Sequence, residues 1–480
     1  MNSKTHLIGR DKEITKLNNI LASDHPEFLV MYGRRRVGKT FLIRQHLEKQ
    51  MVFDFTGTYE ANLKTQLGNF HNQYKRWTGK EDTPKIRSWT EAFELLTNYL
   101  LSLSRRKRIV VFIDELPWLD TRRSGFLSAL EYFWNQHGSQ MSNLLLIGCG
   151  SAASWIRKKL LKAKGGLYNR VTQRIQLHPF SLKETELYLK SRKLKFTRYQ
   201  ILQLYMAMGG IPFYLKEIPT NSSVDQVIDS LCFTPSGLLS DEYNQLYHSL
   251  FKSADDHVAI VEGLGSKPNG LTRSELLKSS KLPDGGTFTR ALTELIDCGF
   301  VMSYKPYKKK KKDTVYRLID LYSLFYLKYI QGNASARRNT WQNLKTHSGY
   351  TAWSGYAYEN IALLHIDQLH HALNIDGMHT QVSSWRFYGN DEIPGSQIDL
   401  IIDRPDDIIH LCEVKFTNKE YILTKEYNTK LRQRTSIFQQ ASATKKLIVN
   451  TLITTYPAIQ NQHYRDIIDS EVTMNELFEK

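Results

Sequence analysis

The residues of this chain best suited to chemistry are a lysine, a threonine and two acids, found in two short motifs. Gly33-Arg34-Arg35-Arg36-Val37-Gly38-Lys39-Thr40 fits the pattern G-x-x-x-x-G-K-[ST] of a phosphate-binding loop. Its glycines permit backbone conformations closed to other residues, and the helix N-terminus after it favours negative charge. The motif predicts a nucleoside triphosphate site in which Lys39 reaches the β and γ phosphates and Thr40 ligates Mg²⁺. The loop residues expected at the nucleotide are Gly33, Arg36, Val37, Gly38, Lys39 and Thr40.

The second motif is an aliphatic run over 109–113 that ends in Asp114 and Glu115. Such a run predicts a parallel strand buried on both faces, which carries its acids to the edge where open α/β sheets place ligands. Asp114 is expected to hold Mg²⁺ through water, and Glu115 to polarise the water that attacks the γ-phosphate. An acidic pair at a strand end also occurs in solvated turns, but the upstream loop favours the catalytic interpretation.

The elements that must position these residues alternate between strand-like and helical stretches up to about Cys232. This alternation predicts a parallel α/β sheet. A helix is expected over 41–47, directly after the loop. Ser151 follows the run 144–147 and either senses the γ-phosphate or belongs only to a turn. The expected strands are 28–32, 52–55, 109–113, 144–147 and 174–177.

Composition limits the class of protein. The formal net charge is +17 in 480 residues, which indicates a polyanionic partner. Nucleic acid is favoured over a membrane, because no apolar run approaches the ~18 to 20 residues of a spanning helix. No apolar signal segment follows residues 1–6, and the four cysteines are too far apart for a metal pattern or a disulfide framework. We therefore expect a cytoplasmic protein of about three domains.

The N-terminal part resembles the STAND and AAA+ group of P-loop ATPases, specifically the archaeal and bacterial type with a C-terminal nuclease-like domain. Segment 9–13 is similar to the family's G-R-x-x-E box, which lies close to the adenine in relatives. Segments 165–170 and 174–180 resemble its fifth-strand region, and 209–215 the G-x-P element of its helical lid. The resemblance implies ATP hydrolysis with Mg²⁺, a lid that brings Pro212 to the nucleotide, and homo-oligomers formed through the ATPase domain. Arg170 either contacts the γ-phosphate, from its own or a neighbouring subunit, or is a surface arginine.

The middle part, from about residue 255 to 331, is expected to form two helices and a hairpin. A capping box from Thr272 to Glu275 opens the first helix, and the apolar face over 287–296 marks the second. Two strands, near 299–301 and over 314–318, flank the lysine run 308–312. This order resembles a winged helix, which would offer its second helix to the major groove of DNA and its lysines to phosphates. Many such modules dock protein instead, and a lysine run is often a solvated edge. The residues expected at the groove are Thr287, Thr289 and Arg290.

The third part, from about residue 349, carries a second set of acids. Strands are expected over 397–402 and 408–416, and Glu413 and Lys415 share a face because strand residues alternate. With Asp399 from the adjoining strand they could bind Mg²⁺, activate water and neutralise a scissile phosphate. The pattern resembles the PD-(D/E)XK nuclease core, in which Glu359 matches an acid supplied by the first helix. Asp399 follows isoleucine and not proline, and a scaffold kept only for binding is the alternative.

The expected fold is α/β in three domains: a P-loop ATPase with a helical lid over 1–235, a winged helix over 240–335 and a PD-(D/E)XK nuclease-like domain over 345–480. Two functions remain open. In the first, an ATPase gates metal-dependent cutting of DNA, in defence against foreign DNA or in mobile-element biology. In the second, a nucleotide-switched protein binds DNA or serves as a scaffold and does not cut.

Overall fold

The computed structural model describes residues 7–104, 107–161, 169–251, 253–333 and 340–479. Residues 1–6 and 165–168, to which two of the sequence interpretations refer, lie outside these ranges. The chain divides into two compact units, one ending at His178 and the other beginning at Pro179. The predicted boundaries near 235 and 340 therefore fall inside the second unit and stay predictions.

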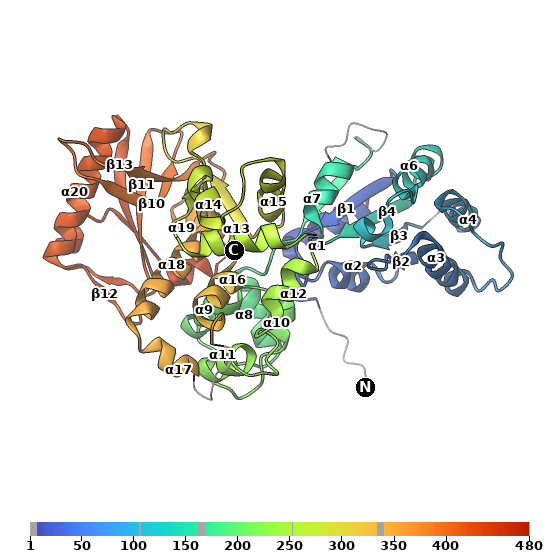
Figure 1. The fold of residues 1–480 in the computed structure, drawn as a ribbon, viewed down its shortest axis with the longest axis horizontal. Coiled ribbons are helices and arrows are strands. Elements are labelled where there is room, and N and C mark those ends of the chain that lie inside the picture. The colour runs from blue at the N-terminus through green and yellow to red at the C-terminus, as the bar shows by residue number, and fades with distance from the viewer. Residues whose placement is uncertain (1–6, 105–106, 162–168, 252, 334–339, 480) are drawn as a thin grey trace. The chain divides into compact units, whose positions relative to one another are not determined.

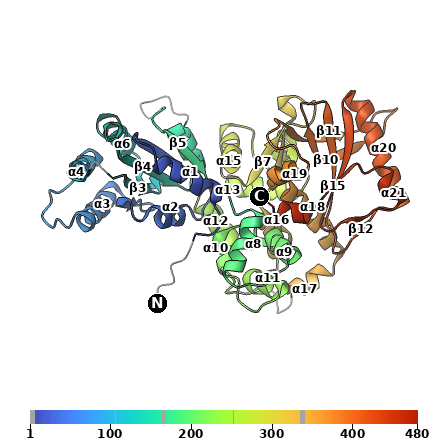
Figure 2. The same cartoon turned by 180° about the vertical axis from the view of Figure 1, so that it is seen from behind.

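The first unit is built on a five-stranded parallel sheet in the order β2-β3-β4-β1-β5. All the described residues of β3 and β4 are buried, as expected of aliphatic runs at the centre of a sheet. In Figures 1 and 2, α2 and α6 lie on opposite sides of the strands. The parallel α/β sheet predicted from the sequence is confirmed. Its strands are β1 (Glu27–Tyr32), β2 (Met51–Thr56), β3 (Ile109–Asp114), β4 (Leu144–Gly150) and β5 (Gln173–Gln176).

Two helices of this unit, α3 and α4, begin with a side-chain cap. The side chains of Asn62 and Ser88 accept hydrogen bonds from backbone N–H groups at the start of α3 and α4. The Trp89 ring packs edge-on against Phe70 and Phe126, and this joins three helices into one core. The helices are α1 (Asp11–Leu21), α2 (Lys39–Leu47), α3 (Leu63–Thr78), α4 (Trp89–Ser102), α5 (Leu116–Leu119), α6 (Phe126–Gln136) and α7 (Ala153–Ile156).

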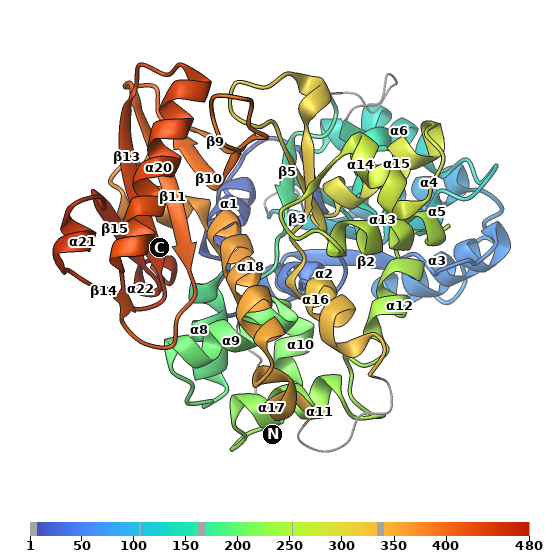
Figure 3. The same ribbon diagram turned by 60° about the vertical axis from the view of Figure 1, so that its left-hand side comes forward.

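The second unit starts with helices and ends with a mixed five-stranded sheet. The sheet order is β15-β13-β11-β10-β9, in which β9, β10 and β11 are antiparallel and β11, β13 and β15 are parallel. Figure 3 shows α18 and α20 beside this sheet. Ile437 and Phe438 of α20 bury the core residues Ile401 and Leu411 on one face. The strands are β9 (Gln381–Phe387), β10 (Ser396–Asp403), β11 (Ile408–Lys415), β12 (Tyr421–Ile422), β13 (Leu447–Thr454), β14 (Ala458–Ile459) and β15 (Ser470–Thr473).

Along the chain, one group of helices precedes the strands of this sheet, and a second group lies between or after them. Those before it are α8 (Leu182–Ser191), α9 (Arg198–Met208), α10 (Pro212–Lys216), α11 (Val224–Cys232), α12 (Glu242–His248), α13 (Asp255–Gly265), α14 (Arg273–Ser280), α15 (Gly286–Asp297), α16 (Leu321–Phe325), α17 (Thr340–Lys345), α18 (Ser348–Leu364) and α19 (Ile366–Ala372). Those within or after it are α20 (Lys425–Ser442), α21 (Gln462–Arg465) and α22 (Met474–Leu477). Among all described residues, no helix is both long and apolar enough to cross a membrane.

The middle of the second unit contains the expected two helices and hairpin. The Thr272 and Glu275 side chains form the capping box that opens α14, and α15 buries Phe288, Leu292 and Leu295. The hairpin pairs β7 (Val301–Tyr304) with β8 (Val315–Leu318), and β6 (Leu271–Thr272) adds a third strand. These elements were predicted correctly from local patterns.

The connection between β7 and β8, which carries the lysine run, packs on the C-terminal sheet. Tyr307 is buried in the core under the C-terminal sheet, where its ring lies 5.4 Å from Phe438, and its backbone N–H donates to Ser384 O at 2.8 Å. Lys308 Nζ donates to Ser442 O at 2.8 Å. All five residues of the predicted lysine run are exposed, but the Lys308 ammonium is held by a carbonyl at the end of α20.

The predicted lid helices pack on the C-terminal elements. The backbone N–H of Leu182, at the start of α8, donates to His365 Nε2 at 3.0 Å. The Tyr199 ring on α9 stacks on Phe416 with centroids 5.6 Å apart. These contacts explain why residues after 178 form one unit with the C-terminal sheet.

Candidate functional site

The phosphate-binding loop joins β1 to α2 with the backbone that its glycines allow. Gly33 has φ 151° and Gly38 has φ 92°. A Cβ at Gly33 would lie 2.2 Å from Leu177 O, so no larger residue fits there. Gly38 caps α2 without a side-chain hydrogen bond. The first N–H groups of this nine-residue helix therefore face the loop and favour an anion.

Lys39 is a buried cation at the first position of α2. Its Nζ donates to Gly33 O and Arg34 O, both at 2.8 Å, and the residue is 6% exposed. The ammonium group is therefore folded back onto its own loop. An anionic phosphate is a stronger acceptor than a peptide carbonyl and would compete for this group.

Thr40 and Asp114 meet at the C-terminal edge of the sheet. The Thr40 hydroxyl donates to Asp114 Oδ2 at 2.6 Å, and the Glu115 N–H donates to Asp114 Oδ1 at 2.9 Å. Asp114 is buried at the end of β3, two strands from β1, because β4 lies between them. The predicted strand thus brings this carboxylate to the predicted magnesium ligand on α2.

Glu115 lies next to this pair in a left-handed backbone conformation with φ 50°. Its Oε2 accepts hydrogen bonds from the Ser151 N–H at 3.2 Å and the Ser151 hydroxyl at 3.1 Å. Burial raises the pKa of Glu115, the Lys39 cation opposes that shift, and the Asp114 charge adds to it. The sequence placed Ser151 near the phosphate site, but no pattern in it indicated that Ser151 holds Glu115.

Arg10 is a further buried residue at this site. It occupies the N-cap of α1 in a left-handed conformation, and its guanidinium donates to Val37 O at 3.0 Å. Burial lowers the pKa of His178, and the Arg10 charge adds to the shift. The sequence indicated the segment around Arg10 by resemblance only, and its contact with the phosphate-binding loop was not predicted.

The residues present fit a magnesium-bound triphosphate. The loop offers helical N–H groups and an ammonium, and the Thr40 hydroxyl and the Asp114 carboxylate are hard oxygen donors. Mg²⁺ on nucleotides takes one or two protein oxygens and completes its shell with water and phosphate.

Arg170 and Pro212 are two further residues that were predicted to lie at the nucleotide. Arg170 is exposed in the turn before β5. Pro212 begins α10 in the second unit. Their roles stay predictions.

The predicted second centre lies in the C-terminal sheet, and Glu413 of β11 is its most enclosed member. Glu413 Oε1 is 2.7 Å from Lys415 Nζ and also accepts from the Tyr427 hydroxyl, while Oε2 is paired with Arg434. Burial would raise the pKa of Glu413, but the Arg434 and Lys415 cations outweigh it and lower the pKa to about 2. Tyr427 and Arg434 come from α20, 14 and 21 residues further along the chain, and sequence spacing did not reveal them.

Glu359 of α18 is also held by a cation. Arg317 on β8, 1% exposed, donates to Glu359 Oε2 at 2.9 Å and to Asn360 Oδ1 at 2.6 Å. Burial and the Asp399 charge raise the pKa of Glu359 to about 7, against the effect of Arg317. An arginine from the middle segment therefore pairs with the acid expected to bind metal.

Asp399 lies on β10, the strand that pairs with β11, which carries Glu413 and Lys415. The pairing of β10 with β9 shifts register between Ile398 and Ile401, which is the mark of a β-bulge, and Asp399 falls inside it. Asp399 Oδ1 accepts from Gln397 Nε2 at 2.5 Å and lines a pocket with Arg386. Glu413 contacts Tyr427 and Arg434 of α20. Asp399 and Glu413 both act electrostatically on Glu359, and the expected metal-binding roles of these three acids stay predictions.

Comparison with known proteins finds a family match in the N-terminal part of the chain. Residues 7–218 match a family described as an ATPase domain predominantly from Archaea. The match covers less than half of the chain and identifies its N-terminal part as an archaeal-type ATPase domain.

One curated relative and two solved structures resemble the chain at low sequence identity. The uncharacterized protein MJECL04 of Methanocaldococcus jannaschii is 26% identical over 399 residues, which are 82% of this chain and 83% of that protein. Among solved structures, the Walker-type ATPase PABY2304 of Pyrococcus abyssi has a TM-score of 0.49 and 18% identity, covering 67% of this chain and 96% of that chain. The ORC2 protein of Aeropyrum pernix has a TM-score of 0.45 and 14% identity, covering 72% of this chain and 96% of that chain.

Proposed function

We propose that this chain is an ATP-hydrolysing switch protein that binds DNA. The observation that carries the proposal is the placement of Lys39, Asp114 and Glu115 together at one edge of the parallel sheet. The Lys39 and Asp114 charges both act on the Glu115 carboxylate, and Thr40 donates to Asp114 at 2.6 Å. Phosphoryl transfer requires this combination of a phosphate-binding cation, metal oxygens and a water-orienting acid.

The residues would divide the work of hydrolysis as follows. Lys39 exchanges its two loop carbonyls for β and γ phosphate oxygens. Thr40 and Asp114 hold Mg²⁺, which neutralises charge on the phosphates when it is bound. Glu115 orients the attacking water and accepts its proton, while the two Ser151 hydrogen bonds fix the carboxylate.

Two exposed surfaces of the second unit support a DNA partner. Thr287, Thr289 and Arg290 are exposed on α15, the second helix of the winged-helix-like segment. The exposed lysines 309–312 follow in the connection between β7 and β8. With a net charge of +17, these groups suit a polyanion whose phosphates position the protein and whose base edges are read by a helix.

ATP binding and turnover in two variants test the proposal. Lys39→Ala should abolish ATP binding in calorimetry, whereas Glu115→Gln should bind ATP and stop its hydrolysis. Equal ATP affinity in wild type and Lys39→Ala would refute the assignment of the site. Homo-oligomers formed through the ATPase domain, with Arg170 acting in a neighbouring subunit, remain part of the proposal. Sedimentation with ATP bound tests that part.

Metal-dependent DNA cleavage by the C-terminal sheet is a second candidate activity. It is favoured by Glu413, which two cations keep ionised in spite of burial, beside Lys415. Asp399 and Glu413 both act electrostatically on Glu359, so the three acids are near one another. Against cleavage stand the bulge at Asp399 and the cations already paired with Glu413 and Glu359. A nucleic-acid-binding scaffold that does not cut is the alternative.

A further inference from the structure

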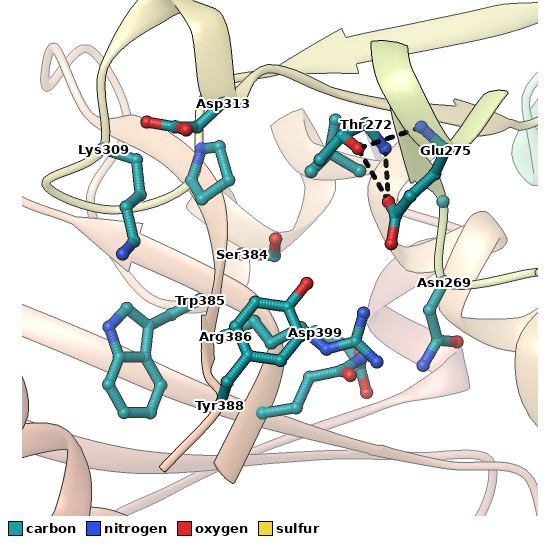
Figure 4. A pocket seen from close by; sticks show the side chains of 14 residues that line it. Asn269, Thr272, Glu275, Lys309, Asp313, Ser384, Trp385, Arg386, Tyr388 and Asp399 are labelled. Carbon is teal, nitrogen blue, oxygen red and sulfur yellow. Dashed lines mark hydrogen bonds between the residues drawn. The ribbon is translucent and has the colours of Figure 1, made fainter. Parts of the chain in front are cut away.

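A small pocket in the second unit lies beside Asp399 and has no part in the ATP site. Its volume is about 150 Å³, and Figure 4 shows the side chains around it. One wall comes from the winged-helix-like segment, through Thr272, Glu275 and Lys309. The other comes from β9 and β10 and includes Arg386, Tyr388 and Asp399.

The strand wall presents an aromatic ring and a guanidinium to solvent. Trp385 and Phe387 alternate with Arg386 on β9 and with Tyr388 directly after it, and Trp385 packs on Phe438 under the sheet. This alternation puts Arg386 and Tyr388 on the face of the sheet opposite to the one that Trp385 packs against Phe438. Tyr388 is 78% exposed, and the Arg386 guanidinium lies 5.4 Å from the ring centroid. Leaving so large an aromatic side chain in water has no packing benefit.

Polar groups of both charges surround this ring, including the carboxylates of Glu275 and Asp313. Gln397 is paired with Arg386 across the two strands and donates to Asp399. Across the pocket lies Lys309, on the connection that Tyr307 anchors to the sheet. A cation on each wall can bind phosphate. A glutamine can donate to or accept from base edges, and an aspartate can accept from them.

We propose that this pocket binds one unpaired nucleotide of a DNA strand, with its base stacked on Tyr388 and its phosphate held by Arg386 and Lys309. The proposal rests on the DNA binding proposed above and narrows the substrate to DNA with unpaired bases. A duplex is too wide for the pocket, and its bases already stack on both sides. Stacking on an exposed aromatic beside basic groups is how proteins bind single strands without reading their sequence.

The test compares single-stranded and duplex DNA of one sequence, each ~15 nucleotides long, by fluorescence anisotropy with the full chain. EDTA is present and nucleotide is absent, so that cleavage and ATP play no part. The variants are Tyr388→Ala, Tyr388→Phe and Arg386→Ala. Tyr132→Ala is the matched control, because Tyr132 is 51% exposed on α6 in the other unit.

Tyr388→Ala should weaken single-strand binding by about five-fold or more, the loss expected for one base stack, and should leave duplex binding within about two-fold. Tyr388→Phe keeps the ring and should bind as wild type does, whereas Arg386→Ala should bind single strands less tightly. Tyr132→Ala should change neither affinity.

Single-strand affinity that is the same in Tyr388→Ala and Tyr132→Ala would overturn the pocket while leaving DNA binding intact. An equal loss for both DNA forms in Tyr388→Ala would also overturn it. Wild-type protein that binds neither form would contradict the proposed DNA binding itself, and the pocket with it.

Discussion

The Glu115 carboxylate accepts two hydrogen bonds from one residue, Ser151, through its backbone N–H and its hydroxyl. Ser151 lies just beyond β4, the strand next to β3 in the sheet. The position of the water-orienting acid thus depends on the neighbouring strand, and not only on the strand that carries it.

Removing the Ser151 hydroxyl should slow ATP turnover without weakening ATP binding. A hydrogen bond to a charged group is worth about 1.5 to 3 kcal/mol, so a reduction of about ten-fold in kcat is expected of Ser151→Ala. Ser151→Thr keeps both donors and is the control. A kcat of Ser151→Ala equal to that of wild type would show that the hydroxyl does not position Glu115.

The salt dependence of DNA binding should show that lysines 309–312 contact phosphates and that Lys308, whose ammonium is held by Ser442 O, does not. Replacing lysines 309–312 with glutamine should flatten the plot of log affinity against log salt, by about 0.9 for each phosphate that the protein no longer neutralises. Lys308→Gln should leave the slope unchanged, because its ammonium is bound to Ser442 O. A slope unaffected by the four-lysine variant would place the phosphate-binding groups elsewhere on the protein.

The first unit was predictable because its signals are local. A buried parallel strand is a continuous apolar run, and the phosphate-binding loop has a fixed spacing, so the positions of Lys39 and Asp114 at one edge of the sheet follow from the sequence. The α14 capping box and the β7–β8 hairpin have local signals of the same kind.

The C-terminal site was less predictable because its contacts join distant residues. The register of β10 against β9 shifts at Asp399, and no pattern in the sequence of β10 marks that shift. Arg317 is 42 residues from Glu359, and Arg434 is 21 residues from Glu413. Pairing across such separations depends on tertiary packing, which the periodicity of a single strand or helix does not report.

If the C-terminal sheet cuts DNA, Glu413→Gln and Asp399→Asn should each reduce Mg²⁺-dependent nicking of supercoiled plasmid by about a hundred-fold. ATP binding should not change. Lys415→Ala should act in the same direction, and Glu359→Ala less, because Arg317 already pairs with Glu359. Asp406→Asn, at an exposed pair with Arg404, is the control.

Intact plasmid with Mg²⁺ or Mn²⁺, both with and without ATP, would favour the non-cutting alternative. Nicking that persists in Glu413→Gln would mean that the cutting centre lies at another site.

Acid should destabilise the second unit through His365. Its Nε2 accepts from Leu182 N–H at 3.0 Å, and its Nδ1 lies 2.8 Å from Ile361 O, so the ring is neutral. Burial lowers its pKa from 6.5 to about 4. Between pH 4 and pH 6.5 the folded chain favours the neutral ring and the unfolded chain favours the charged ring. The stability that His365 contributes is therefore complete above pH 6.5 and is lost as the pH falls toward 4.

The full loss is about 3 kcal/mol at about 1.4 kcal/mol per pKa unit. His365→Gln keeps an acceptor but does not titrate, so its thermal midpoint should fall less than that of wild type between about pH 7 and pH 5. Parallel pH profiles for the two proteins would contradict this role of His365.

The affinity for DNA in different nucleotide states tests the proposed switch most directly. Glu115→Gln should retain ATP, and its DNA affinity should differ between ATP and ADP by at least about five-fold, the lower end of usual coupling between two sites. Lys39→Ala, which should bind neither nucleotide, should show one affinity throughout. If Glu115→Gln binds ATP but has the same DNA affinity with ATP, with ADP and with no nucleotide, the protein is not a nucleotide-controlled DNA-binding switch.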